Sequence, residues 1–479
     1  MQNSRSQIMK NLRSNPLFYI FITAPIVLWF ICLLLPTFDD WSYITTPGNG
    51  VYIKRNILPF WSYWRPFDAI IGWILSLYHP LFPILNHIIV YGAHLISTFI
   101  IYKLCIILQY NQRAIAISTF FFYFSPAVLG TVLGIDSINQ ATAQLWGLVG
   151  LYLYLINNKH KRQQYILWIS SVFMATLSKE NGICFFVVIP FIAYGFDFID
   201  KKKLIRHWSI GIAAAIVYFT VRLLLNNNQV DINHEYFENT LLSKAKHVAM
   251  FVAYPFINFD YVSLFYPPKR NIFIVIITLI FALPFIVFLF FKQRKQLTSK
   301  PFIILSLSMF LLALPHLLTL FTTMHAYAGH SMAALIIGLL VNQCNKKSLL
   351  QWLFLLFVVS NIYTDYHHWI MSYRSGLTGK SMAQQAINKT GVPVDKVYTI
   401  TIDKGEQKYS SFCVIPVYAF GWGIAAANET NYEWPKEMED STIYKDEINN
   451  IPSIINHAFK KGYNCIWIVD NNHIEVVKK

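Results

Sequence analysis

The sequence predicts a polytopic α-helical membrane protein with about 11 transmembrane helices and a small C-terminal α/β domain. Hydrophobic residues make up 55% of the 479 residues and charged residues only 13%, whereas soluble chains carry about a quarter charged residues. Segments without Asp, Glu, Lys or Arg recur, for example 14–38, 69–102, 114–135 and 137–158. Each is long enough for the roughly 20 helical residues that cross a bilayer.

The apolar segments predict eleven membrane helices. Near-continuous Leu, Ile and Phe favour helices over the alternating strands of a barrel, because a helix pairs its backbone groups within the segment. The expected helices are 17–36, 84–108, 113–133, 137–156, 163–178, 182–198, 207–225, 272–291, 301–322, 326–342 and 348–367.

Basic residues predict the orientation, because short cytoplasmic loops retain Lys and Arg. They occur before the first helix and in every second connection, so we expect a cytoplasmic N-terminus and an outer C-terminal domain. They are Arg5, Lys10, Arg13, Arg113, Lys159, Lys161, Arg162, Lys201, Lys202, Lys203, Arg206, Lys292, Arg294, Lys295, Lys346 and Lys347. Topology and anionic headgroups therefore explain the formal charge of +15 better than nucleic acid does. The Lys, Ile and Asn content favours a bacterial inner membrane.

One segment leaves the number of spans open. Residues 247–267 are apolar and aromatic, and they form either a twelfth span or an interfacial or re-entrant segment. We expect the second arrangement, with Asp260 near the headgroups. A twelfth span would move the C-terminal tail to the other side of the membrane.

The chain divides by composition into a transmembrane domain, residues 1–370, and a periplasmic α/β domain, residues 371–479. In the second part, "SMAQQAINKTG" predicts an amphipathic helix. The segments "KVYTITID", "FCVIPVYAFGW" and "NCIWIVDNNHIEVV" predict strands, and the last contains an Asp-Asn-Asn turn suited to a hairpin.

The first outer loop, residues 37–83, holds the side chains best suited to chemistry. Its candidate residues are Asp39, Asp40, Lys54, Arg55 and Arg65. Singly they have structural explanations, since Asp39 can cap a helix and Arg65 can snorkel. Together they suit group transfer from a lipid-linked phosphate. A carboxylate removes a proton from an acceptor hydroxyl, and fixed cations neutralise the departing phosphate.

A second candidate is the outer hairpin "ATLSKENGICFF", in which Lys179 and Glu180 interrupt two apolar segments. It is either a charged turn with Glu180 as a helix cap, or a place where an ammonium faces a phosphate-sized ligand. Arg222, near the outer end of its helix, either snorkels or reaches the same phosphate.

The order of these motifs resembles the GT-C class of membrane glycosyltransferases and, within it, the protein O-mannosyltransferase-related branch. The motifs are Asp39-Asp40 after the first helix, Arg-Pro-Phe (65–67) before the second, His87 and His94 seven apart within it, and Ser-Lys-Glu-Asn (178–181) after the fifth. The resemblance covers roughly residues 17–200, weakens as far as residue 370 and is absent from the tail.

The resemblance implies transfer of a sugar from a polyprenyl-phosphate-linked donor to a glycan, lipid or protein acceptor, usually with inversion, on the outer face. It assigns the base to the acidic pair, and we expect Asp39 to be that base. Asp40 then orients it or binds a divalent cation such as Mg²⁺ or Mn²⁺, as in some members of the class. The expected substrate-binding residues are Arg65 and Lys179 first, Lys54 and Arg55 second, and Glu180, Asp136 and Arg222 beside them.

Two departures and two alternatives stay open. After Pro126 the chain offers no acid until Asp136, and "MHAYAGHS" replaces an Arg-Tyr-rich helix start, so the metal and the second acidic position are undecided. A transporter or lipid flippase would show inverted repeats and midplane charges, and a glycan polymerase or ligase would carry a large late outer loop. His87 and His94 either bind a metal or, as we expect, form interhelical hydrogen bonds.

Overall fold

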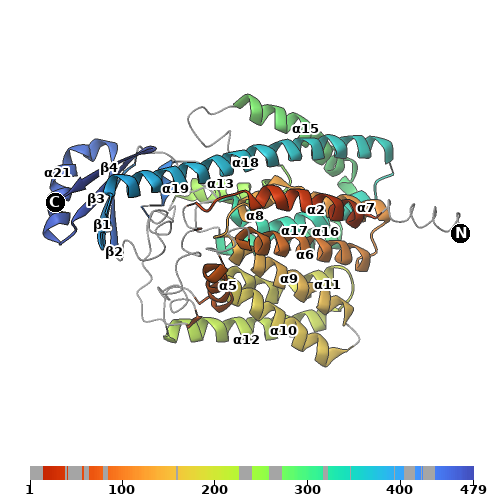
Figure 1. Ribbon diagram of the computed structural model, residues 1–479. Helices are drawn as coiled ribbons and strands as arrows, with labels where there is room; N and C mark the ends of the chain where they lie inside the picture. The colour runs from red at the N-terminus through yellow and green to blue at the C-terminus, as the bar shows by residue number, and fades with distance from the viewer. Residues whose placement is uncertain are drawn as a thin grey trace, which may run out of the picture.

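The computed structural model describes residues 15–37, 40, 57–58, 64–78, 85–157, 160–225, 240–257, 272–316, 322–345, 347–392, 394–403, 416–421, 423 and 437–479. Its helices form one bundle, and a four-stranded sheet lies beyond one end of that bundle (Figure 1). The long helix α18 joins the two parts.

The structure has elements beyond the expected ones, including a helix over Pro66–Tyr78 within the expected first outer loop. The helices and strands are α2 (Pro16–Cys32), α5 (Pro66–Tyr78), α6 (Leu85–Ile107), α7 (Gln112–Tyr123), η2 (Pro126–Val128), α8 (Leu129–Val132), α9 (Ile138–Ile156), α10 (Lys161–Ser178), η3 (Glu180–Cys184), α11 (Phe185–Gly195), α12 (Lys201–Leu225), α13 (Leu241–Ala253), α15 (Ile272–Lys292), η5 (Arg294–Thr298), α16 (Lys300–Ala313), η6 (Leu314–His316), η7 (Thr323–His325), α17 (Ala326–Asn342), α18 (Lys347–Thr390), β1 (Lys396–Asp403), α19 (Pro416–Phe420), β2 (Glu437–Tyr444), η8 (Lys445–Asn450), α21 (Ile451–Lys460), β3 (Cys465–Asp470) and β4 (His473–Lys478).

Helix α17 forms the centre of the bundle. Every residue from Ala326 to Val341 is buried, and the helix packs against α7 and α16. Small residues permit this close packing. A Cβ added to Gly338 would lie only 2.6 Å from the Tyr110 ring. Outer helices such as α12 and α15 instead expose large apolar side chains, for example Leu223 and Phe273, as an integral membrane protein does toward lipid.

The count of eleven spans stays a prediction. Helix occurs in all eleven expected segments, but five helices are long and apolar enough to cross a membrane by length and composition among the described residues. A sixth is reached if the bent pair of α7 with η2–α8 is one span. In the segment 247–267, only the residues up to 257 are described. Helix α13 ends within this part, at Ala253.

The expected span 113–133 is bent by 43° at its middle. Helix α7 ends at Tyr123, and Ser125 starts the next turn by accepting a hydrogen bond from the Ala127 N–H at 3.2 Å. Pro126 at the first position ends the earlier helix, because it has no N–H to donate. The bend leads the chain into α8 and then to Asp136 before α9.

Helix α18 runs without a break through residues 370 and 371, the predicted domain boundary. Two of its glycines allow close contacts with other segments. A Cβ on Gly376 would lie 2.8 Å from the Leu35 Cβ, and one on Gly379 would lie 2.6 Å from the Ala419 carbonyl oxygen. The helix thus contacts both the N-terminal segment after α2 and the C-terminal domain.

The C-terminal sheet has the strand order β2-β1-β3-β4. Strand β1 pairs in parallel with β2 and β3. The predicted hairpin is confirmed, since β3 and β4 pair antiparallel with Asp470 opposite His473. Asn471 takes a positive φ of 53° in its turn, a conformation that Asn tolerates better than most residues.

The prediction of a strand over "FCVIPVYAFGW" is wrong for its described part. Residues Pro416–Phe420 form helix α19, and Val417 and Phe420 pack in the same core as Met382 and Ala383 of α18. Residues 437–444, which sequence analysis left unassigned, supply strand β2 instead. Residues Pro416–Phe420 therefore attach the sheet to α18 and do not add a strand to the sheet.

Candidate active site

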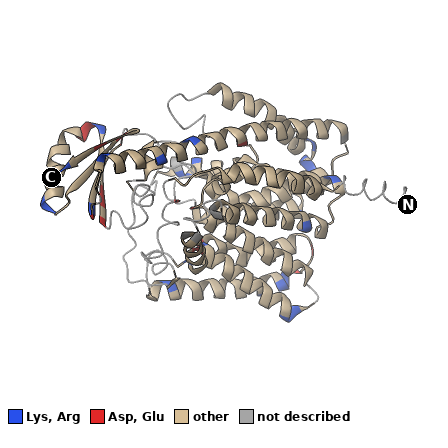
Figure 2. Cartoon of the chain, viewed as in Figure 1, with Lys and Arg blue, Asp and Glu red and all other residues tan. Residues whose placement is uncertain are grey.

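Charged and polar side chains from separate helices meet at the end of the bundle nearer the sheet. Helix α5 and the last turn of α12 lie at this end, whereas Lys and Arg also gather at the opposite end, where α10 and α12 begin (Figures 1 and 2). The residues brought together are Asp40, Arg65, Asp136, Lys179, Glu180 and Arg222.

Glu180 is the centre of an ion-pair network. The Arg65 guanidinium donates to both carboxylate oxygens, with Nη2 2.7 Å from Oε2 and Nε 3.1 Å from Oε1. The Arg222 guanidinium lies 3.7 Å from Oε1 on the other side. Burial alone would raise the pKa of Glu180, but Arg65 and Arg222 lower it to about 2. Glu180 is therefore a firmly ionised partner of both arginines.

The two arginines are also held by packing next to the network. Trp64 precedes Arg65 and stacks on Tyr218 of α12, with ring centroids 5.3 Å apart and planes 4° from parallel. Tyr218 stands one helical turn before Arg222. The stack therefore joins the residues just before α5 to the last turns of α12.

Lys179 lies between α10 and η3 in an extended conformation, with φ −154° and ψ 143°. Burial and the Arg65 charge lower the pKa of its ammonium to about 8, against the opposing charges of Glu180 and Asp136. Within the described part of the chain no hydrogen bond or ion pair holds this ammonium. It is a half-buried cation available for an anionic ligand.

Asp40 joins the first outer loop to the chain before α9. Its Oδ1 accepts from the N–H groups of Ile135 at 2.6 Å and Asp136 at 2.9 Å, and its Oδ2 accepts from the Thr37 N–H at 3.0 Å. Burial, followed by the Asp136 charge, raises the pKa of Asp40, and the three N–H donors oppose this rise. Burial also raises the pKa of Asp136, to about 6. Asp40 thus positions the loop and Asp136.

A group of neutral polar residues adjoins Lys179 and was not singled out as a site by sequence analysis. Asn181 donates from Nδ2 to Gln140 Oε1 at 3.0 Å and contacts His316 Nε2 at 3.1 Å. The His316 and His325 rings stack with centroids 4.0 Å apart. Three buried atoms of this group have no hydrogen-bond partner among the described residues: Gln140 Nε2, Asn181 Oδ1 and His325 Nδ1. The group offers one free N–H donor and a free carbonyl acceptor.

The remaining predicted residues have the following positions. Asp39, Lys54 and Arg55 lie outside the described residues. The expected hydrogen-bonding role of His94 is confirmed, because its Nδ1 lies 3.1 Å from the Tyr327 hydroxyl of α17. His87 is buried, and neither of its ring nitrogens has a hydrogen-bond partner among the described residues.

A divalent cation at Asp39 and Asp40 stays a prediction, because Asp39 lies outside the described residues. Both Asp40 oxygens are engaged by backbone N–H groups, and the described His, Cys, Asp and Glu residues form no group of three able to hold a metal ion. No step proposed below depends on a metal.

Comparisons with known proteins add little. No family model matches the sequence, and neither does any curated protein. One solved structure that is similar is the crystal structure of ArnT from Cupriavidus metallidurans bound to undecaprenyl phosphate. Its TM-score is 0.49 at 10% identity, over 96% of this chain and 97% of that chain. A likeness at this level carries no argument about fold or function.

Proposed function

We propose that this protein is an integral-membrane glycosyltransferase of the GT-C type that uses a polyprenyl-phosphate-linked sugar as donor. The observation that carries the proposal is the half-buried Lys179 ammonium, which lies beside the Arg65–Glu180–Arg222 network and has no hydrogen bond or ion pair among the described residues. A cation in this position is suited to a phosphate that arrives laterally from the bilayer. The order of the sequence motifs supports the same donor class.

In the proposed reaction, Lys179 binds the donor phosphate, and Arg65 adds charge from its ion pair with Glu180. An acceptor hydroxyl attacks the anomeric carbon, the bond from that carbon to the phosphate oxygen breaks, and polyprenyl phosphate leaves with the electron pair. Asp39 takes the hydroxyl proton, while Asp40 orients it through its backbone contacts. Attack opposite the leaving group inverts the anomeric carbon. Lys179 and Arg65 act most strongly as charge develops on the leaving phosphate.

The neutral group of Gln140, Asn181 and His325 supports a sugar as the transferred group. A hydroxyl both donates and accepts hydrogen bonds. It therefore matches the free Gln140 Nε2 donor and the free Asn181 Oδ1 acceptor. Leaving such buried atoms without partners costs about 1–3 kcal/mol each, so a polyol would gain from binding there.

The test is transfer by the reconstituted full chain. Proteoliposomes receive undecaprenyl phosphate linked to a radiolabelled hexose or pentose, together with envelope extract of a deletion strain as acceptor. We expect label to move into the extract and undecaprenyl phosphate to be released. Lys179→Ala should lower turnover at least tenfold, because charge-assisted bonds to phosphate are lost, while the exposed Lys461→Ala should not. Label that crosses the bilayer still attached to its lipid would indicate a flippase and contradict the proposal.

The proposed orientation puts the N-terminus in the cytoplasm and the C-terminal domain on the same outer face as the site. The start of α10 and the sheet lie at opposite ends of the bundle (Figure 1), which supports this arrangement. In intact cells of a variant with Cys413 and Cys465 replaced by Ser, an impermeant thiol label should modify Asn472→Cys. It should reach Lys161→Cys only after permeabilisation. The reverse pattern would contradict the orientation.

A further inference from the structure

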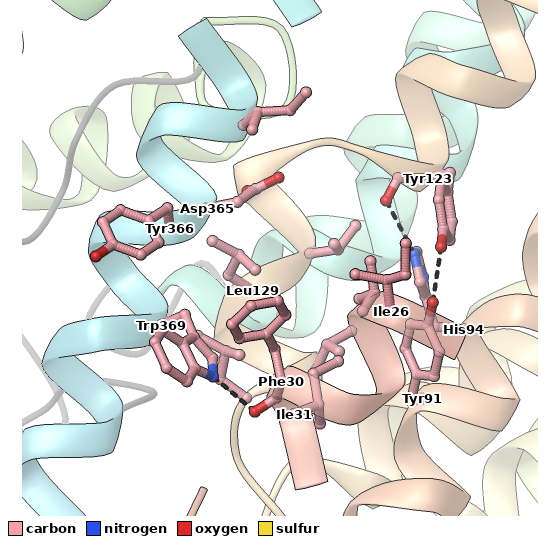
Figure 3. A pocket seen from close by; sticks show the side chains of 15 residues that line it. Ile26, Phe30, Ile31, Tyr91, His94, Tyr123, Leu129, Asp365, Tyr366 and Trp369 are labelled. Carbon is pink, nitrogen blue, oxygen red and sulfur yellow. Dashed lines mark hydrogen bonds between the residues drawn. The ribbon is translucent and has the colours of Figure 1, made fainter. Parts of the chain in front are cut away.

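A cavity of about 300 Å³ opens on the side of the bundle between α2, α8 and α18 (Figure 3). Its wall is mainly aliphatic and aromatic, including Ile26, Phe30, Leu129 and Trp369. Ile26 is 58% exposed and Phe30 43% exposed, so the opening faces the lipid side rather than the bundle core. An apolar chain from the bilayer therefore fits the cavity.

One polar atom in the wall differs from the others. The Tyr91 and Tyr123 hydroxyls bond each other at 2.7 Å, and His94 Nε2 lies 3.3 Å from the Tyr123 carbonyl oxygen. Asp365 reaches from α18 over the cavity (Figure 3). Its Oδ1 is buried and has no hydrogen-bond partner among the described residues. The cavity thus combines an apolar wall with one carboxyl oxygen in need of a donor.

The position of Asp365 along α18 places it at the level of the headgroups. Eighteen residues separate it from Lys347, the start of the helix, which is about 27 Å at 1.5 Å per residue. This nearly equals the ~30 Å hydrocarbon thickness. Exposed apolar side chains occur before it, such as Val359, and Tyr366 and Trp369 follow it as an aromatic belt does. The cavity wall on α18 runs from Ile362 to Trp369, on both sides of Asp365.

We propose that the cavity binds a phospholipid with a primary-amine headgroup, from the leaflet at the sheet end of the bundle. The headgroup ammonium bonds the Asp365 carboxylate, and an acyl chain fills the space beside Leu129 and Ile26. A carboxylate so close to apolar surface needs a cationic partner, and this lipid supplies both the charge and the chain. A lipid phosphate without an amine, including polyprenyl phosphate, would meet the Asp365 charge unfavourably. This proposal does not depend on the proposed function.

The test is photocrosslinking of the full chain in nanodiscs. Phosphatidylethanolamine or phosphatidylglycerol, each with a diazirine in one acyl chain, is irradiated, and the labelled peptides are mapped. We expect phosphatidylethanolamine to label α2 and α18 near the cavity, with phosphatidylglycerol labelling there at least tenfold weaker. Asp365→Asn should remove most of this preference, about tenfold, because a charge-assisted bond is lost. The exposed Asp446→Asn is its matched control.

Filling the cavity provides a second test. Leu129→Trp should abolish labelling near the cavity by both lipids, whereas Val359→Trp, on the lipid-facing side of α18, should not. If Leu129→Trp does not fold, Ile26→Trp serves the same purpose. Equal labelling by the two lipids, or an unchanged preference in Asp365→Asn, would overturn the proposal. So would displacement of phosphatidylethanolamine by undecaprenyl phosphate at equal concentration, which would identify the occupant as the polyprenyl chain.

Discussion

Two glutamates of this protein have similar partners in different surroundings. Glu180 in the bundle pairs with Arg65 and Arg222 and is 21% exposed. Glu439 in the sheet pairs with Lys461 at 2.7 Å and accepts from the Tyr463 hydroxyl at 2.9 Å, and it is 39% exposed. Both glutamates have lowered pKa values. At Glu180 the charges of Arg65 and Arg222 lower the pKa against the opposing effect of burial, whereas at Glu439 hydrogen bonds from Lys461 and Tyr463 lower it. The two glutamates make similar contacts, and their different exposure to solvent decides how much each contact contributes to stability.

The largest expected effect is the loss of the Glu180 carboxylate. Glu180→Gln removes the carboxylate that pairs with both the Arg65 and the Arg222 guanidinium groups. Removing one member of a buried pair costs 3–5 kcal/mol and of an exposed pair up to about 1. We expect a loss of about 2 kcal/mol at this partly exposed site, read as a lower thermal midpoint in detergent.

The pH dependence of stability provides a check on Glu180. A carboxyl with a lowered folded pKa stabilises the protein above its unfolded pKa, and the contribution disappears as pH falls through the folded value. The stabilisation from Glu180 should therefore be complete above about pH 4.5 and decrease toward about pH 2. Glu180→Gln should lack this part of the acid transition. A variant with the wild-type midpoint and acid transition would show that the pair is only a surface contact.

The next effect concerns Asp40, whose carboxylate accepts three backbone N–H bonds. Asp40→Asn replaces one acceptor oxygen by an NH₂ group that faces an N–H donor. We expect a loss of about 1–3 kcal/mol, measured by denaturation in detergent, together with reduced transfer activity because Asp136 is no longer positioned. Asp446→Asn, on the exposed turn η8, should change neither quantity. An Asp40→Asn variant that keeps full stability and activity would contradict the positioning role.

A smaller effect is expected from pH on the donor requirement. The pKa of Lys179 is lowered to about 8, and only the protonated ammonium attracts phosphate. The apparent KM for the donor should therefore rise as pH increases through about 8. Lys179→Arg keeps its charge at high pH, so its KM profile should stay flat there. A wild-type profile that matches the arginine variant would show that Lys179 does not bind the phosphate.

The smallest expected effect is the loss of the exposed Glu439 carboxylate. Glu439→Gln should leave the thermal midpoint within experimental error, because solvent and salt already screen the charge of Lys461. A loss as large as that of Glu180→Gln would mean that exposure does not explain the difference between the two glutamates.

Local sequence patterns were sufficient to predict several features of the protein. Helix occurs where uncharged apolar runs predict it, and the Asp-Asn-Asn turn marks the β3–β4 hairpin. The candidate residues Arg65, Lys179, Glu180 and Arg222 do come together. Long-range partners were not predictable, since no sequence spacing indicates that Glu180 would be held by Arg65, 115 residues away. The same limit explains why Gln140 and Asp365 gave no signal as possible binding residues.

The sequence by itself determined that much of this protein is surrounded by lipid, and where its positive and negative charges lie along the chain. Apolar run length and charge placement are properties of each segment, so they hold in any packing. Tertiary structure alone decided that "VYAF" becomes a helix against α18 rather than a strand. It also decided that Asp40 binds backbone N–H groups near Asp136, and that a carboxyl on α18 lies beside a lipid-facing cavity. These depend on which surfaces meet, because burial and the choice of partner set the energy of every polar group.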